Sequence, residues 1–172
     1  AENMIWADKK GNIGWQVAGI APVRKNFSGM VPVPGDGRYE WNGYLDMLKR
    51  PHQLNPKKGF LATANQNVTP KDYRYWDAIG YTWADPYRGD RINEVLQADN
   101  RQTLKKTEAL QTDYYSIPAR KLIPMLAELK FSSPLYEAAK EELGKWNFVL
   151  NKSSVAAGIY AIWERELYQW SD

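Results

Sequence analysis

The 172-residue sequence contains no cysteine, and His52 is its single histidine. The lack of cysteine excludes disulfides, a thiolate zinc site and a cysteine nucleophile. The lone histidine excludes metal motifs that need two. No apolar run approaches the roughly 20 residues that a helix needs to cross a bilayer, so we expect no membrane span. The net charge of +3 is small and dispersed, and it gives no argument for nucleic-acid binding.

The overall composition is that of a globular chain, with 44% hydrophobic and 25% charged residues. The length suits a single domain that buries roughly 70% of its unfolded surface. Ala1 leads directly into a strand-like run, with no signal or transit segment, and the sequence does not begin with Met. We therefore expect these residues to be a piece of something longer.

The composition changes near residue 88. Seven of the ten prolines and nine of the twelve glycines precede Arg88. Residues 1–88 are therefore predicted to form strands and long loops, and residues 89–172 to be helical. Together they are predicted to form one partial domain of the α+β class, with a sheet that is small for its helices.

In the first part, residues 4–7 and 13–18 predict a hairpin around a glycine-containing loop at 8–12. Residues 22–58 show neither helical nor strand period and are predicted to be a long loop. Its aromatic residues, Tyr39, Trp41 and Tyr44, are expected to pack against something. Residues 60–64 resemble a short buried strand.

In the second part, helices are predicted to begin at residue 91, to run over 104–114 and 116–129, and to begin again at 134 and near 154. The predicted helix at 116–129 has an apolar face that is expected to point inward, formed by Leu122, Met125, Leu126 and Leu129. Pro124 predicts that this helix begins late or is kinked. Ser133 and Pro134 predict an N-cap followed by proline at the first helical position.

Individual motifs do not identify a chemistry. The run Gly35-Asp36-Gly37 lacks the spacing of a phosphate loop and is better explained as a tight turn. His52 is more typical of a surface histidine than of a general base. The 8 Trp and 11 Tyr allow a second hypothesis, a non-catalytic module whose aromatic-rich loop binds a carbohydrate or apolar ligand. Core filling is the simpler explanation for them.

Several blocks of sequence together resemble the penicillin amidase (penicillin acylase) family, which includes cephalosporin and acyl-homoserine lactone acylases. The blocks lie between residues 4 and 91, and the similarity continues into the helical part at Leu110-Gln111 and Asp113. The blocks are Trp6-Ala7-Asp8, Gly11 to Trp15, Pro22 with Arg24, Val31 to Gly37, Trp41-Asn42-Gly43, Leu54-Asn55-Pro56, Gly59 to Asn67 and Asp90-Arg91-Ile92.

The resemblance implies a fragment of the four-layer αββα fold of N-terminal-nucleophile hydrolases. In that family a precursor cleaves itself, and the new N-terminal serine of the large chain attacks an amide with its own α-amine as the base. This sequence begins with Ala1 and has no serine before Ser28, so it resembles an internal piece of the large chain. We expect it to be inactive alone, to require the remaining segments of the enzyme as partners, and to self-associate when isolated.

The resemblance also implies roles for single residues. Asn65 matches the asparagine whose side-chain amide helps to form the oxyanion hole, although a polar turn residue is the simpler explanation. Arg91 matches an arginine that organises the active site, the alternative being an ion pair with Asp90 or Glu94. Glu2 and Asn3 match a strand that borders the acyl pocket.

A structural calcium ion is also implied, although no cofactor is needed for the chemistry. Asp77 matches a carboxylate ligand and Gly29 a backbone carbonyl ligand. Calcium takes six to eight oxygen ligands, so two residues would not hold it without others. The substrate is expected to be a small-molecule amide of unknown acyl group, and the location periplasmic or secreted.

Overall fold

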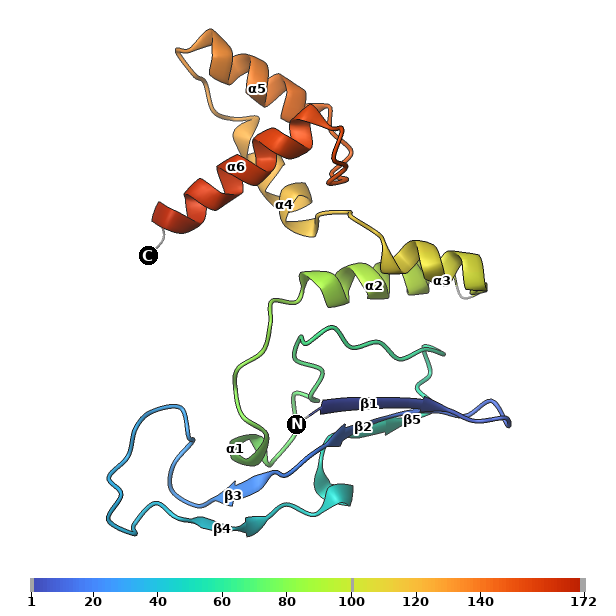
Figure 1. Cartoon of the computed structure of the whole chain (residues 1–172), viewed down its shortest axis with the longest axis vertical. Helices are drawn as coiled ribbons and strands as arrows, with labels where there is room; N and C mark the ends of the chain where they lie inside the picture. Colours follow the sequence, from blue (N-terminus) through green and yellow to red (C-terminus); the bar gives the residue numbers. More distant parts are fainter. Residues whose placement is uncertain (1, 100, 171–172) are drawn as a thin grey trace. The chain divides into compact units, whose positions relative to one another are not determined.

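The computed structural model describes residues 2–99 and 101–170 (Figure 1). The chain divides into two compact units, Ala1–Asn100 and Arg101–Asp172. Helix α2 (Tyr87–Ala98) is thus grouped with the strands, although the composition changes at its start. The α+β class expected from the sequence is confirmed, with a small antiparallel sheet and several helices.

The first unit is built on a three-stranded antiparallel sheet. Strand β1 (Glu2–Ala7) pairs with β2 (Ile13–Ala18), which pairs with β5 (His52–Leu54) (Figure 1). The predicted hairpin is confirmed. Its loop is held by the carboxylate of Asp8, which accepts hydrogen bonds from the side chain and backbone of Asn12. These hydrogen bonds lower the pKa of Asp8.

The segment 22–58, predicted to be a loop, contains short regular elements. Strand β3 (Pro22–Arg24) pairs with β4 (Trp41–Tyr44), followed by the 3₁₀ turn η1 (Met47–Lys49) and β5. Strands of three or four residues carry too few side chains to show a period, and their pairing partners are distant in sequence. The packing expected for the aromatic residues is confirmed only for Tyr39, which is half-buried with its ring 5.9 Å from that of Phe27. Trp41 and Tyr44 are 57% and 60% exposed.

The core of this unit is small. Ala21, Leu45 and Ala78 are buried, the last on helix α1 (Trp76–Ile79), with partly buried side chains around them (Val23, Tyr73, Tyr75 and Ile79). The strand predicted at residues 60–64 is not found. Ala64 is buried, but the segment is irregular in the described structure, so its apolar character reflects partial burial without strand pairing.

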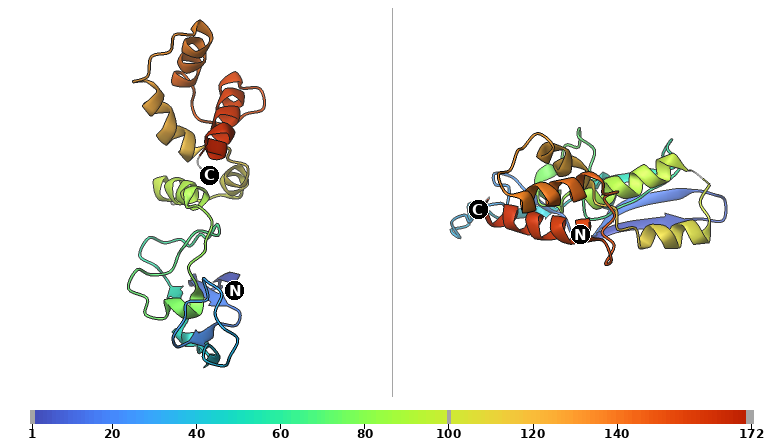
Figure 2. Two further views of the ribbon diagram at one scale, coloured as in Figure 1. Left: turned by 90° about the vertical axis from the view of Figure 1, so that its left-hand side faces the viewer. Right: turned by 90° about the horizontal axis from the view of Figure 1, so that it is seen from above.

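The second unit is helical and contains α3 (Leu104–Gln111), α4 (Ile117–Leu126), α5 (Pro134–Gly144) and α6 (Val155–Trp170) (Figure 2). Ser116 is the N-cap of helix α4, because its Oγ accepts a hydrogen bond from the Ala119 amide at 3.1 Å. Of the two alternatives predicted from Pro124, the late start is wrong, since Pro124 lies inside a helix that begins at Ile117. The kink stays a prediction. Helix α5 begins after Ser133, as predicted.

The core of the second unit lies among α4, α5 and α6. Its buried members are Ala119, Ile123, Leu143, Trp146, Ala156, Ala157 and Tyr160. Leu122 and Leu126 pack against this cluster as predicted, but Met125 is exposed because Ile123 and Ala119 provide the inward face. Leu129 is also exposed and lies beyond the end of the helix at Leu126. The Tyr160 hydroxyl donates to Glu164 Oε1 at 2.6 Å, and burial raises the pKa of Tyr160.

Across residues 2–99 and 101–170, none of the helices combines the length and the apolar character that crossing a bilayer requires.

Candidate functional site

The turn that carries Asn65 is irregular and strained. Asn65 has a positive φ of 65°, a left-handed conformation that asparagine tolerates better than most residues. Its carbonyl oxygen accepts a hydrogen bond from the amide of Ala84 at 3.0 Å. The backbone of the turn is thereby attached to the segment that leads into α2, while the Asn65 side chain remains exposed.

A pocket of about 590 Å³ opens beside this side chain. Its lining comes from three parts of the first unit: the β1–β2 hairpin, the turn at 65–69 and the segment at 79–84. The lining residues are Glu2, Asn3, Trp15, Val17, Asn65, Val68, Thr69, Ile79, Thr82, Trp83 and Ala84. Glu2 and Asn3, which the sequence placed at the border of an acyl pocket, thus share a cavity with Asn65.

Hydrogen bonding orders the hairpin side of this pocket. The indole Nε1 of Trp15 donates to Asn3 Oδ1 at 2.7 Å, across the paired strands β1 and β2. The Trp15 side chain is buried, and the half-buried Trp83 also lines the pocket. The cavity therefore has both indole walls and polar amide groups, a combination typical of small-molecule sites.

The arginine that contacts Asn65 is Arg88, which the sequence analysis missed. Arg88 Nη2 donates to Asn65 Oδ1 at 2.8 Å. Arg91, the arginine singled out from the sequence, lies three residues later on α2 and forms a 3.6 Å ion pair with Glu94, one of its two expected partners. Arg88 and Arg91 are three residues apart, so both lie on one face of a helix, and this spacing is the sequence signal that could have indicated Arg88.

Gln66 joins the Asn65 turn to the same helix. Its Oε1 accepts from the Ala64 amide at 2.6 Å, and the side chain is buried. The carboxamide of Gln66 lies against Gly89, where a Cβ atom would come within 2.4 Å of Gln66 Cδ. The close approach of the turn to α2 thus depends on a glycine at position 89, because any larger residue would place a Cβ atom against Gln66.

The two residues singled out for calcium both adjoin Arg24. The Arg24 guanidinium donates to the carbonyl oxygen of Asp77, and a Cβ atom on Gly29 would lie 2.9 Å from Arg24 Nε. Asp77 Oδ1 accepts from the Tyr81 hydroxyl at 2.6 Å, which raises the pKa of Tyr81. Oxygen donors suit calcium, but in the described ranges no three acidic, histidine or cysteine side chains gather as a metal site.

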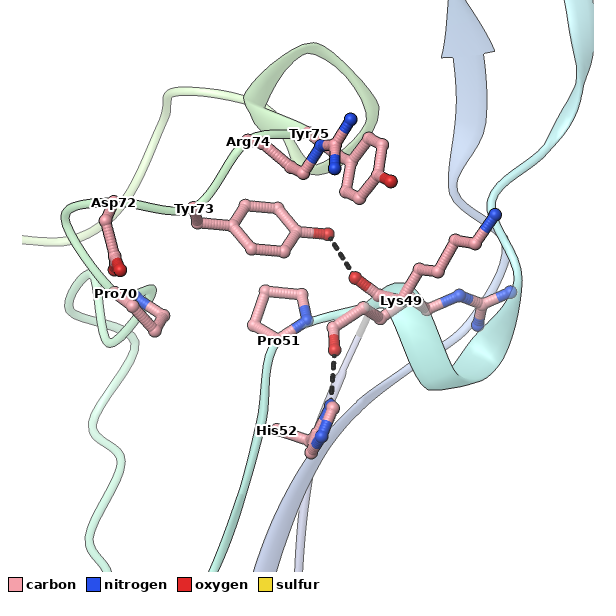
Figure 3. Close-up of a pocket in the computed structure, with 9 residues that line it drawn as sticks. Lys49, Pro51, His52, Pro70, Asp72, Tyr73, Arg74 and Tyr75 are labelled. Atoms are coloured by element: carbon pink, nitrogen blue, oxygen red, sulfur yellow. Dashed lines mark hydrogen bonds between the residues drawn. The ribbon is translucent and has the colours of Figure 1, made fainter.

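A second pocket, of about 330 Å³, lies around the end of η1 and the start of β5 (Figure 3). The Tyr73 hydroxyl donates to the Lys49 carbonyl at 2.9 Å, and His52 Nδ1 lies 2.8 Å from the Arg50 carbonyl oxygen. Since a carbonyl accepts only, Nδ1 carries the proton. His52 is exposed, as expected of a surface histidine.

The first pocket has the features of a site for a polar reaction. Among its lining residues, Asn65 offers amide N–H groups, and Thr69 and Thr82 offer hydroxyls. Among the described residues that line this pocket there is no serine, cysteine or lysine. The arrangement can stabilise negative charge that develops on a bound carbonyl group.

Comparisons with known proteins identify the family of the chain. Residues 1–172 match the sequence model of the family described as penicillin amidase. The chain is 40% identical over 137 residues to the acyl-homoserine lactone acylase QuiP of Pseudomonas syringae pv. syringae, covering 79% of this chain and 16% of the relative. It is 30% identical over 167 residues to the penicillin acylase 2 proenzyme of Pseudomonas sp. (strain SE83), covering 96% and 21%.

A solved structure is similar as well. The thermostable penicillin G acylase from Alcaligenes faecalis superposes with a TM-score of 0.64 and 26% identity, over 86% of this chain and 27% of that one. The chain thus spans only about a sixth to a quarter of the proteins that it matches.

Proposed function

Because the chain belongs to the penicillin amidase family, we propose that it supplies the oxyanion-stabilising part of an amide hydrolase. The complete enzyme cleaves an N-acyl amide through an acyl-serine intermediate, and the nucleophilic serine lies outside these 172 residues. By itself the chain is inactive. The observation that carries the proposal is that the exposed residue Asn65 lines the 590 Å³ pocket.

The proposed role of Asn65 is to donate an amide N–H to the developing oxyanion. When the serine attacks, the carbonyl oxygen of the substrate gains negative charge, and a fixed donor stabilises that charge more than it stabilises the ground state. Arg91 is proposed to organise the same site from α2, where its ion pair with Glu94 restrains it. No metal or organic cofactor takes part in the bond cleavage.

Other features of the complete enzyme are also proposals. Two relatives bear names that refer to penicillin and acyl-homoserine lactone, so the substrate is proposed to be an N-acyl amide of that broad kind. The remaining segments of the enzyme are the proposed partners, and the periplasm or the exterior is the proposed location. A structural calcium ion would take oxygens from Asp77 and Gly29, with the other ligands supplied from outside this chain.

The test is Asn65→Ala in the complete enzyme. We expect turnover to fall by roughly two or more orders of magnitude, as for the loss of one oxyanion donor elsewhere. Asn26→Ala is the matched control, because the Asn26 amide donates to the Arg38 carbonyl in a separate loop and, among the described residues, to no other group. Turnover of Asn65→Ala near that of the unmodified enzyme would refute the proposal.

The alternative of a carbohydrate-binding module depends on Trp41 and Tyr44, which form an exposed edge-to-face pair with ring centroids 6.4 Å apart. Oligosaccharide titration followed by tryptophan fluorescence tests it directly. A saturable change that Trp41→Ala abolishes would favour the module, whereas the hydrolase proposal expects no such change.

A further inference from the structure

We infer that Arg88 is a positioning residue that fixes the direction of the Asn65 carboxamide; this inference rests on the proposed function of Asn65. A carboxamide has one accepting and one donating end, and only the donating end stabilises an oxyanion. A guanidinium donates and never accepts. The 2.8 Å contact from Arg88 Nη2 therefore holds Asn65 Oδ1 against α2 and directs the NH₂ group away from the guanidinium.

The backbone of Asn65 is also held, by contacts with α2 and the segment that precedes it. Its carbonyl oxygen bonds the Ala84 amide at 3.0 Å, three residues before α2 begins. Gln66, the next residue, lies against Gly89, which directly follows Arg88. The backbone of the turn is thus fixed, and rotation of the Asn65 side chain is the remaining freedom. The terminal torsion of asparagine has broad, roughly two-fold wells, so rotation exchanges the O and NH₂ positions easily.

The surroundings of Arg88 agree with a role toward Asn65. The side chain is exposed on the first turn of α2. In the described part of the chain its guanidinium makes its hydrogen bond to Asn65 and forms no ion pair with a carboxylate. Arg88 therefore contributes little to the stability of the helix, and its removal leaves the carboxamide free to present its oxygen toward the substrate.

The experiment is a double-mutant cycle in the complete enzyme with Arg88→Ala, Asn65→Ala and the double variant. We expect Arg88→Ala to lower kcat about tenfold to a hundredfold while KM changes little, because the lost interaction acts in the transition state. Asn65→Ala removes the group that Arg88 orients, so the double variant should be no slower than Asn65→Ala alone.

Two further measurements separate orientation from general structure. Arg88→Lys, which keeps a donor, is expected to retain an intermediate kcat, and added guanidinium ion at concentrations below those that unfold the enzyme is expected to raise the kcat of Arg88→Ala. Arg38→Ala is the control, because Arg38 pairs with Asp36 in a separate loop. Melting temperatures of all variants are measured alongside.

An unchanged kcat for Arg88→Ala, or additive losses in the double variant, would overturn the role of Arg88 while the effect of Asn65→Ala still supports the proposed function. An unaffected Asn65→Ala would overturn both. If Arg88→Ala melts below the assay temperature, Arg88→Lys and a guanidinium-rescue assay of Arg88→Ala at a lower temperature decide together. The inference is contradicted if Arg88→Lys has the kcat of the unmodified enzyme and guanidinium does not raise the kcat of Arg88→Ala.

Discussion

Gly89 and Gln66 approach so closely that a single added methyl group on Gly89 would overlap the Gln66 carboxamide at 2.4 Å. Because Gln66 is buried and its Oε1 holds the Ala64 amide, the side chain cannot move without breaking that hydrogen bond. The packing of one turn against one helix residue therefore determines where the adjacent Asn65 lies.

Gly89→Ala is expected to destabilise the first unit by about 1–3 kcal/mol, through overpacking and the loss of a buried hydrogen bond. Gly158→Ala is the matched control. It also lies within a helix, but a Cβ atom there meets nothing within 4 Å, so better helix propensity should stabilise by about 0.5–1 kcal/mol. Urea unfolding of both variants measures the difference. A neutral Gly89→Ala would show that Gln66 relocates freely.

Ser116→Ala is expected to destabilise the second unit by about 0.5–2 kcal/mol, because Ser116 Oγ is buried and caps α4 through the Ala119 amide. Ser133→Ala provides the comparison, since Ser133 precedes α5 without a side-chain capping hydrogen bond. Its effect should stay within about 0.5 kcal/mol. Thermal unfolding measured by circular dichroism compares the two, and equal losses would contradict the assigned cap.

The contacts of Glu137 at the start of α5 are expected to stabilise the fold less at acidic pH. Its carboxylate accepts from Lys140 Nζ and from the Phe131 amide, each at 2.7 Å, and these bonds lower the pKa of Glu137 below its ordinary 4.5. A depressed carboxyl pKa stabilises the fold above the unfolded value, and the stabilisation disappears as pH falls through the folded value.

Glu137→Gln should therefore lower the melting temperature at pH 7, and the difference from the unmodified chain should shrink below pH 4.5. Glu141→Gln removes a longer, exposed contact of 3.9 Å to Lys145 and should change the melting temperature little. A difference for Glu137→Gln that stays constant from pH 7 to pH 3 would contradict the assigned ion pair.

The isolated 172-residue chain is expected to self-associate. Strand β1 is an edge strand on which Met4, Ile5 and Trp6 are 52%, 46% and 45% exposed, so both of its faces and its free edge are open to pairing. Ile5→Lys should increase the monomer fraction in sedimentation velocity. Leu48→Lys, on the exposed turn η1, should not. A fully monomeric unmodified chain would refute the expectation.

Sequence patterns predicted the elements whose signals are local. The β1–β2 hairpin follows from alternation around a glycine-containing loop, and the start of α5 follows from Ser133 and Pro134, although the Ser133 side chain makes no capping hydrogen bond. The inward face of α4 was predicted only in part, because an apolar side chain such as Met125 satisfies the helical period whether or not a neighbour covers it.

The chain's own sequence determined its α+β class and its resemblance to a family, because both depend on the order and spacing of residues along the chain. Tertiary structure alone decided the pairing of β3 with β4 and the meeting of Arg88 with Asn65. Strand pairing and a contact across 23 residues depend on how distant segments fold back on each other. No local periodicity records that, which is why Arg91 was singled out while Arg88 holds the carboxamide.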